Sequence, residues 1–321
     1  MKPAFRHINR TCFSPFVAIA ALLIGGLAMT CAAAEVGRIG VTVTDLGNPF
    51  FVRIGRGVEN AARRIVGPDV KVFVVSSAYD LKRQNDQIDA FIKKKVDLIV
   101  LNAADPEAIE PAVRRAQAEG IRVVAIDVRA EGADATVTTD NVQAGQKACQ
   151  YIAKRLKGNG DVVIISGPPV SAVIDRVAGC QAVFKTSPGI HVLSSNRNGG
   201  GSAEGGFAKM TDVLTLFPHI DAVFAINDPT AIGADNAARQ AGRKEFFIVG
   251  VDGSPKAKVQ MRDPNSLIAA TVAQMPDQLA QKAVESGYAL IRKQSLPNPV
   301  VLIPAVLLTR DFTPDVGGWG Q

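Results

Sequence analysis

The sequence contains few residues of the kinds that carry catalysis or bind metals. Its 321 residues include three histidines and four cysteines. His191 and His219 are the only histidines beyond residue 34, and neither lies near a cysteine or acidic cluster with metal-ligand spacing. The G-x-S-x-G, H-E-x-x-H and G-x-x-x-x-G-K-[ST] motifs are also missing. We therefore expect no enzymatic activity, no cofactor and no bound metal.

Cysteine is also too scarce to build a disulfide-rich fold. Cys12 and Cys31 lie in an N-terminal segment that we expect to be removed, which leaves Cys149 and Cys180. Each of these two falls in a predicted helix, where a buried thiol is common. Two free thiols and a single bridge between them are both compatible with the sequence.

Long hydrophobic runs are absent except at the N-terminus. Three basic residues there precede an apolar stretch over residues 16–29, and alanines follow at 32–34. A basic start, a short apolar core and a small-residue exit are typical of a secretory signal peptide, and the stretch is short for a membrane anchor. We predict cleavage near Ala34 and export of the mature chain. A lipoprotein acylated at Cys31 is the alternative.

Charge of one sign is not in large excess. The formal net charge is +6, and three of the basic residues belong to the predicted signal peptide. The balance therefore gives no argument for nucleic-acid binding. Hydrophobic residues at 47% and charged residues at 21% are ordinary for a soluble α/β protein, and the length suits about two domains.

What the sequence does contain is a regular alternation of short apolar runs and longer amphipathic segments. The predicted strands cover residues 39–43, 70–75, 98–101, 123–126, 162–166, 191–195, 222–226, 246–249, 267–272 and 300–303. The predicted helices cover residues 50–65, 81–94, 106–118, 142–156, 172–185, 203–217, 230–241, 256–261 and 276–291. This alternation predicts right-handed βαβ units and parallel sheets with helices on both faces. This number of parallel strands exceeds one sheet for this length, so we expect two lobes.

Several predicted strands end in polar side chains suited to hydroxyl groups. Asn102, Asp127, Asn227, Asp252 and Gln274 each follow an apolar run. Taken singly, Asn or Asp after a strand is more often a helix cap or a turn residue. Because the carboxyl ends of parallel strands converge on one crevice, we expect these five side chains to lie close together.

The stretch after the first predicted strand adds aromatic surface to this crevice. Asn48 offers donor and acceptor groups, and Phe50 and Phe51 can cover the C–H face of a small polyhydroxylated molecule. Buried carboxylates need a cationic partner, and Arg176 is the best candidate in the second half. Convergent amides, carboxylates and aromatic faces predict a sugar-binding site.

In its motifs the chain resembles periplasmic solute-binding proteins of the ribose-binding type, across essentially all of residues 38–312. Taken as an ordered set, these motifs are specific for that family. They are Asn48-Pro49-Phe50-Phe51, Thr139-Asp140-Asn141, Val223-Phe224-Ala225-Ile226-Asn227-Asp228, Val249-Gly250-Val251-Asp252-Gly253 and Ala273-Gln274-Met275-Pro276-Asp277-Gln278.

The resemblance implies an α/β fold of two similar doubly wound lobes with parallel sheets. Three hinge crossovers, near residues 139–141, 274–275 and 304–305, would join the lobes, and hinge closure would enclose the ligand. The implied parts are a signal peptide (1–34), an N-terminal lobe (35–139 and 276–304), a C-terminal lobe (140–275 and 305–313) and a tail (314–321). We expect this tail to be a frayed end and assign no role to Trp319.

Carried over position by position, the resemblance implies one ligand-binding set. It comprises Asn48, Phe50, Phe51, Asn102, Asp127, Arg176, Asn227, Asp252 and Gln274. Two positions depart from the ribose pattern. Val128 stands where an arginine is expected, and residues 199–201 are glycines where an aromatic ring is expected. Unless Arg129 fills the gap, we expect the ligand to be another pentose, a furanose or a short polyol.

The implied partners are a small sugar or polyol and the permease of an ATP-driven importer, with a chemoreceptor as a further partner in some relatives. We expect a monomer that binds no nucleic acid. A periplasmic sensor subunit that presents its ligand to a membrane receptor is the alternative function. A sugar-responsive regulator of the lac-repressor type would need an N-terminal helix-turn-helix, where this chain has the predicted signal peptide.

Overall fold

The computed structural model describes residues 37–312 and Trp319. The predicted signal peptide, its cleavage point near Ala34 and the alternative acylation of Cys31 lie outside the described residues. Among the helices of residues 37–312, none combines the length and the apolar character that crossing a membrane requires. The described chain forms two six-stranded sheets.

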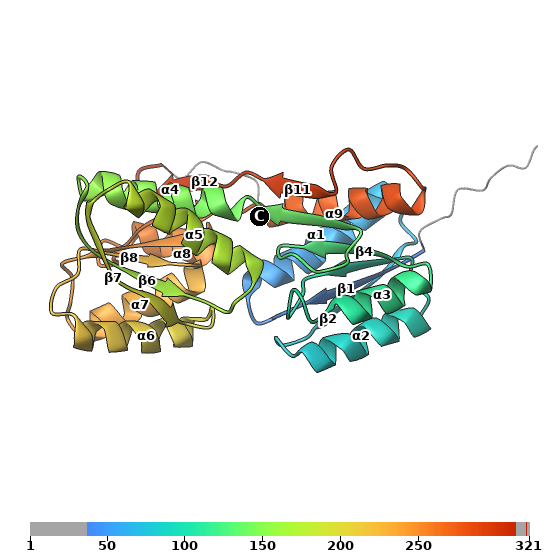
Figure 1. The fold of residues 1–321 in the computed structure, drawn as a ribbon, viewed down its shortest axis with the longest axis horizontal. Coiled ribbons are helices and arrows are strands. Elements are labelled where there is room, and N and C mark those ends of the chain that lie inside the picture. The colour runs from blue at the N-terminus through green and yellow to red at the C-terminus, as the bar shows by residue number, and fades with distance from the viewer. Residues whose placement is uncertain (1–36, 313–318, 320–321) are drawn as a thin grey trace, which may run out of the picture. The chain divides into compact units, whose positions relative to one another are not determined.

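The first sheet is entirely parallel and is covered by helices on both faces. In spatial order its strands are β11 (Val300–Ile303), β5 (Ala135–Thr139), β4 (Arg122–Ile126), β3 (Leu98–Leu101), β1 (Arg38–Val43) and β2 (Lys71–Ser76). The helices are α1 (Pro49–Ile65), α2 (Leu81–Lys93), α3 (Glu110–Ala118) and α9 (Pro276–Ile291). Helices α1 and α9 pack together on one face, and α2 and α3 lie on the other (Figure 1). Strand β3 is therefore buried at all four residues, as its unbroken apolar sequence predicts.

The second sheet repeats this plan with one antiparallel edge strand. In spatial order its strands are β12 (Val306–Thr309), β10 (Ile268–Ala273), β9 (Phe247–Asp252), β8 (Ala222–Ala225), β6 (Asn159–Ser166) and β7 (Gly189–Asn198). The helices are α4 (Asn141–Arg155), α5 (Ser171–Lys185), α6 (Ala203–Leu216), α7 (Asp228–Gln240) and α8 (Pro255–Arg262). Helices α4 and α5 pack on one face and α6 and α7 on the other (Figure 1), while β12 runs antiparallel to β10.

The chain passes between the two sheets three times. It leaves the first sheet after β5, returns after β10, and leaves again between β11 and β12. These passages fall at the predicted crossovers near residues 139–141, 274–275 and 304–305. The predicted fold of two doubly wound parallel lobes is confirmed.

Several predicted boundaries are wrong in detail. Strand β5 was not predicted, because three of its five residues are threonines and interrupt the apolar run that marked the other strands. Strand β12 was also not predicted, since only two residues separate it from β11. Helix α3 begins at Glu110 rather than at residue 106, because residues 106–109 form turns. The described chain therefore holds twelve strands, and one of them is antiparallel.

Helices α4 and α5 approach each other closely because two glycines face the partner backbone. A β-carbon at Gly145 would collide with the carbonyl oxygen of Arg176, and one at Gly179 would collide with that of Val142. A disulfide between Cys149 and Cys180 joins the same two helices, with a Cα–Cα distance of 5.1 Å. The structure thus shows the single bridge that the sequence left open. The close contact fixes α5, which carries Arg176.

Candidate functional site

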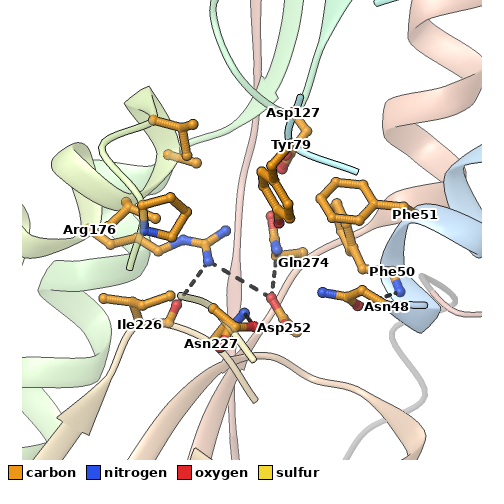
Figure 2. Close-up of a pocket in the computed structure, with 15 residues that line it drawn as sticks. Asn48, Phe50, Phe51, Tyr79, Asp127, Arg176, Ile226, Asn227, Asp252 and Gln274 are labelled. Carbon is orange, nitrogen blue, oxygen red and sulfur yellow. Dashed lines mark hydrogen bonds and ion pairs between the residues drawn. The ribbon is translucent and has the colours of Figure 1, made fainter. Parts of the chain in front are cut away.

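A small cavity of about 60 Å³ lies where the carboxyl ends of strands from both sheets meet (Figure 2). Eight of the nine predicted site residues line it, and Asn102 does not. The lining residues are Asn48, Phe50, Phe51, Tyr79, Asp127, Pro168, Val170, Ala172, Val173, Arg176, Gly201, Ile226, Asn227, Asp252 and Gln274. A larger hollow of about 580 Å³ lies beside it, and the two share Asn48, Tyr79, Gly201 and Asp252.

The N-terminus of α1 supplies one wall of the cavity. Asn48 caps this helix, because its Oδ1 accepts a hydrogen bond from the backbone N–H of Phe50 at 3.0 Å, and Pro49 occupies the first turn. The rings of Phe50 and Phe51 meet edge to face, with centroids 5.4 Å apart. The cap consumes one acceptor of Asn48 and leaves its amide NH2 facing the cavity (Figure 2).

Asp127 lies at the end of β4 and is buried. Asn102 does not line the cavity but holds this carboxylate from behind: its Nδ2 donates to Asp127 Oδ2 at 3.0 Å. The Oδ1 of Asn102 accepts from the backbone N–H and the hydroxyl of Thr44, at 3.1 and 2.8 Å. Burial raises the pKa of Asp127 to about 6, with Arg176 opposing the rise and Asp252 adding to it. In this structure Asn102 thus lies outside the cavity lining and supports Asp127.

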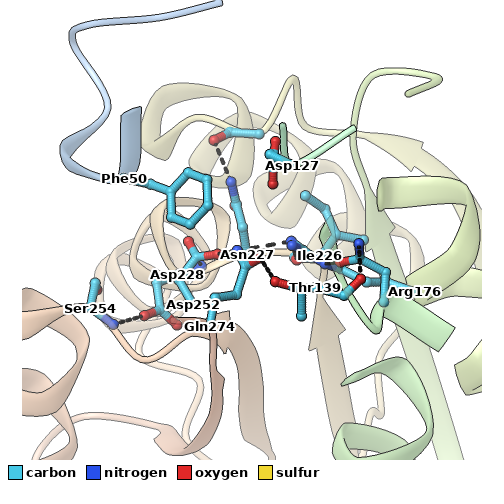
Figure 3. A network of polar contacts seen from close by, with 12 residues as sticks. Phe50, Asp127, Thr139, Arg176, Ile226, Asn227, Asp228, Asp252, Ser254 and Gln274 are labelled. Carbon is cyan, nitrogen blue, oxygen red and sulfur yellow. Dashed lines mark hydrogen bonds and ion pairs between the residues drawn. The ribbon is translucent and has the colours of Figure 1, made fainter. Parts of the chain in front are cut away.

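Arg176 provides the positive charge of the site. The residue is 4% exposed and is held by two hydrogen bonds. Its Nε donates to Asn141 Oδ1 at 2.8 Å, and its Nη1 donates to the carbonyl of Ile226 at 2.9 Å. The same Nη1 lies 3.9 Å from Asp252 Oδ1, so the guanidinium faces the carboxylate across the cavity (Figure 3). Contacts on two sides fix its position before any ligand arrives.

Asp252 lies at the end of β9 with a backbone φ of 135°. Gln274 Nε2 donates to its Oδ1 at 2.8 Å, and Gln274 Oε1 accepts from the hydroxyl of Thr139 at 2.7 Å. This chain of contacts links the second sheet to the last residue of β5 in the first sheet (Figure 3). Burial raises the pKa of Asp252 to about 6, while Arg176 and the Gln274 hydrogen bond oppose the rise.

Asp228 adds a third carboxylate directly behind Asp252. It is fully buried, and it accepts hydrogen bonds from the Thr271 hydroxyl at 2.6 Å and from the backbone N–H of Ser254 at 2.7 Å. Its own N–H lies 3.3 Å from Asp252 Oδ2. Burial and the neighbouring Asp252 raise the pKa of Asp228 to about 7. Buried negative charge therefore exceeds the single guanidinium around this site.

Asn227 caps α7 at the cavity wall. Its Oδ1 accepts from the backbone N–H of Thr230 at 3.0 Å, and its Nδ2 donates to the carbonyl of Gly201 at 2.8 Å. The capping role that is usual for an asparagine after a strand thus coexists with its place in the lining. Its second amide hydrogen and its remaining lone pair are the groups that a ligand could use.

Sequence reasoning missed other lining residues. Tyr79 lines the cavity and is 41% exposed. Because it follows β2 by three residues, the rule that singled out polar residues after strands could have found it. The apolar lining from the β6–α5 connection, which includes Pro168 and Val173, carried no such signal. In a sequence, apolar residues next to a predicted helix are indistinguishable from ordinary residues of the hydrophobic core.

At the two positions that depart from the ribose pattern, the structure places neither an arginine nor an aromatic ring in the cavity. Val128 is 2% exposed and packs in the hydrophobic core of the first lobe rather than against the cavity. Arg129 donates from its Nη1 to Asp175 Oδ2 at 2.8 Å and from its backbone to the Ser171 hydroxyl at 2.8 Å. Arg129 is thus engaged outside the cavity and does not fill the vacant arginine position. Gly201 lines the cavity without a side chain.

The chemistry of this site is recognition rather than reaction. Two buried carboxylates, one fixed guanidinium, three amides and aromatic rings surround a space of small-molecule size. Hydroxyl groups both donate and accept, so they match carboxylates and a guanidinium placed side by side. Within residues 37–312 and Trp319, no cluster of three or more His, Cys, Asp or Glu residues could hold a metal ion.

The sequence and the fold were compared with protein families, curated proteins and solved structures. A profile described as the periplasmic binding protein domain matches residues 39–295. The chain belongs to this family. Its fold and the predicted resemblance to ribose-type binding proteins agree with that membership, and the family is periplasmic.

Two curated relatives illustrate the family. The ribose import binding protein of Bacillus subtilis (strain 168) is 32% identical over 252 residues, which cover 78% of this chain and 80% of the relative. A xylitol-binding protein of Mycolicibacterium smegmatis is 33% identical over 232 residues, which cover 71% and 65%. These relatives are binding proteins rather than enzymes.

A solved structure agrees with the fold. The ABC transporter periplasmic solute-binding protein of Actinobacillus succinogenes 130z, solved with bound D-allose, matches with a TM-score of 0.78 and 27% identity. The match covers 86% of this chain and 98% of that one. The chain is therefore a member of the sugar- and polyol-binding solute-binding proteins of ABC transporters.

Proposed function

We propose that this protein captures one small sugar or polyol in the 60 Å³ cavity and delivers it to the permease of an ABC importer. The observation that carries the proposal is that the fixed guanidinium of Arg176, which lies 3.9 Å from the Asp252 carboxylate, lines one cavity together with the buried carboxylates of Asp252 and Asp127. Phe50 and Phe51 face these groups and offer apolar surface to the C–H side of a sugar. Names of relatives that include ribose, xylitol and D-allose support this ligand class.

The ligand is a pentose-like sugar, a furanose or a short polyol. The cavity is small, about 60 Å³, and side chains from both lobes surround it, which favours a small ligand over an oligosaccharide. Ribose itself is a poorer match, because Val128 lies in the core and Arg129 pairs with Asp175, so one ligand hydroxyl would lack a charged partner. The proposed ligand contacts are the eight lining residues among the nine predicted ones.

Two lobes close on this ligand by hinge bending. The lobes comprise residues 35–139 with 276–304, and 140–275 with 305–313. The three crossovers supply the hinge, and the closed form presents one continuous surface to the permease. Small-angle scattering should give a smaller radius of gyration with saturating ligand than without it. Identical scattering curves would contradict closure.

A thermal-shift screen tests the proposed ligand class. A ligand that binds only the folded protein raises the melting temperature, so pentoses, hexoses, furanoses and short polyols can be ranked by the shift that each produces. We expect a short polyol, a furanose or a pentose other than ribose to rank first. A panel in which no sugar or polyol shifts the melting temperature would contradict the proposed function, and ribose in first place would contradict the selectivity.

A further inference from the structure

Trp319 is the only tryptophan of the chain, and it lies against the binding site. Although it is near the C-terminus, it is 9% exposed. Its indole Nε1 donates a hydrogen bond to the backbone carbonyl of Asp252 at 2.9 Å. Its ring meets the ring of Phe50 edge to face, with centroids 6.1 Å apart and planes at 61°. A residue that the sequence left without a role thus contacts two lining residues of the cavity.

The residue whose carbonyl accepts the indole hydrogen bond has an unusual backbone conformation. Asp252 has a backbone φ of 135°, a conformation that side-chain-bearing residues rarely adopt. Its carbonyl also accepts the backbone N–H of Gln274 at 3.0 Å, so two donors hold one peptide group. A buried indole N–H needs a partner, and this carbonyl supplies one. The contact therefore restrains the peptide that carries the Asp252 carboxylate.

The two partners of Trp319 belong to different sheets. Phe50 lies on α1, which packs on the first sheet, whereas Asp252 ends β9 in the second sheet. The indole lines the 580 Å³ hollow beside the cavity, together with Gly200 and Gly201. These two glycines have φ values of 63° and 70° and bring no side chain into the hollow. The indole thus touches ligand-facing residues of both lobes while it lines only the neighbouring space.

We propose that Trp319 is a positioning residue for ligand binding, which holds Phe50 and Asp252 in their cavity-facing arrangement and joins the two lobes across the cleft. This inference rests on the proposed function. Its consequence is kinetic. Opening of the cleft must break the indole hydrogen bond or separate the two rings, so Trp319 slows the release of a bound sugar more than it changes the rate of capture.

The placement of Trp319 can be tested without any sugar, because a single tryptophan reports its own surroundings. Acrylamide should quench its fluorescence weakly in the native protein and strongly in denaturant. The Phe50→Ala variant removes the ring that faces the indole, so we expect quenching to increase at least about twofold. Phe312→Ala is the matched control, since Phe312 is 59% exposed. Native quenching as strong as in denaturant, or an equal rise in both variants, would overturn the placement.

The kinetic role is tested with xylitol and D-ribose as probes, on the whole mature protein. In Trp319→Ala we expect the dissociation rate to rise about tenfold, with the association rate changed less than about threefold. Trp319→Phe keeps a ring beside Phe50 but loses the N–H, so it should recover part of the loss. Phe312→Ala should dissociate at the wild-type rate.

Each outcome separates the inference from the proposed function. A lower melting temperature in Trp319→Ala with an unchanged dissociation rate would show that the indole serves stability alone, which overturns the positioning role. If neither probe binds the wild-type protein and no other panel member does, the proposed function fails. The quenching result then decides the placement of the indole alone, and the kinetic role falls with the function.

Discussion

Replacing Asp252 by asparagine should lower ligand affinity and raise the stability of the ligand-free protein. Asparagine keeps the size of the side chain and an oxygen that can accept from Gln274, which donates at 2.8 Å. It removes the charge that faces Arg176 at 3.9 Å and that lies next to Asp228. The two effects have opposite signs because the charge is useful only when ligand hydroxyls or Arg176 compensate its burial.

The loss of affinity follows from the loss of a charge-assisted hydrogen bond. Such a bond to a ligand hydroxyl contributes about 2 kcal/mol, so the dissociation constant of Asp252→Asn should rise roughly 30-fold. Asp212→Asn is a matched control, because this carboxylate pairs with Lys209 on the surface of α6 and its side chain is 49% exposed. Titration calorimetry with the sugar or polyol that gives the largest thermal shift measures both variants.

The gain in stability depends on pH. The pKa of Asp252 rises from 3.8 in the unfolded chain to about 6 in the folded protein, because burial disfavours the charged form. A raised pKa stabilises the fold fully below the unfolded pKa, and this stabilisation is lost as pH rises through the folded pKa. At pH 8 the buried charge therefore costs up to about 3 kcal/mol, which Asp252→Asn removes.

Urea unfolding of the ligand-free protein at several pH values provides the assay. We expect Asp252→Asn to be the more stable protein at pH 8, with the difference shrinking as pH falls through about 6 and vanishing below about 4. Wild-type affinity in Asp252→Asn would refute the assignment of this carboxylate to the ligand. Equal stability of the two proteins at pH 8 would refute the reasoning about buried charge.

Three further predictions concern the scaffold and the export of the chain. Gly145→Ala should destabilise the protein by about 1–3 kcal/mol in urea unfolding and weaken ligand binding, because the added methyl group pushes away the backbone of α5. Reduction of the Cys149–Cys180 bridge, or Cys149→Ser with Cys180→Ser, should cost about 2–4 kcal/mol of stability in the same assay. Intact mass of the exported protein should correspond to a chain cleaved near Ala34.

Controls and contradicting results for these three are simple. Gly37→Ala is the control for the glycine variant, because a β-carbon there meets nothing closer than 3.8 Å. Full stability in Gly145→Ala would contradict the close helix contact, and unchanged unfolding under reducing conditions would contradict a stabilising bridge. A mature chain that begins before residue 28, or a diacylglycerol adduct on Cys31, would contradict the cleavage prediction.

The sequence brought most of the cavity-lining polar residues together because of a general property of parallel sheets. Asp127, Asn227, Asp252 and Gln274 are far apart in the chain, yet all follow apolar runs, and strand ends of this kind converge. Asn102 also follows an apolar run, but it lies behind Asp127 and holds that carboxylate through a hydrogen bond from its Nδ2. The apolar pattern and the place of a residue after a strand could not distinguish a residue that lines the cavity from one that supports it.

Other features depend on contacts that no local pattern encodes. Strand β5 has the sequence Ala-Thr-Val-Thr-Thr, and its burial comes from β4, β11 and α9 rather than from its own apolarity. Trp319 follows a glycine-rich stretch that reads as a frayed end, and its burial depends on Phe50 and Asp252. Such long-range contacts become visible only in three dimensions.

The most direct test of the binding site is a crystal structure of the protein with the sugar or polyol that gives the largest thermal shift. We predict that the ligand occupies the cavity between the lobes, with hydroxyl groups within hydrogen-bond distance of Asp252 and Arg176 and a C–H face against Phe50 or Phe51. A ligand bound elsewhere on the protein, with this cavity filled only by water, would contradict the central claim.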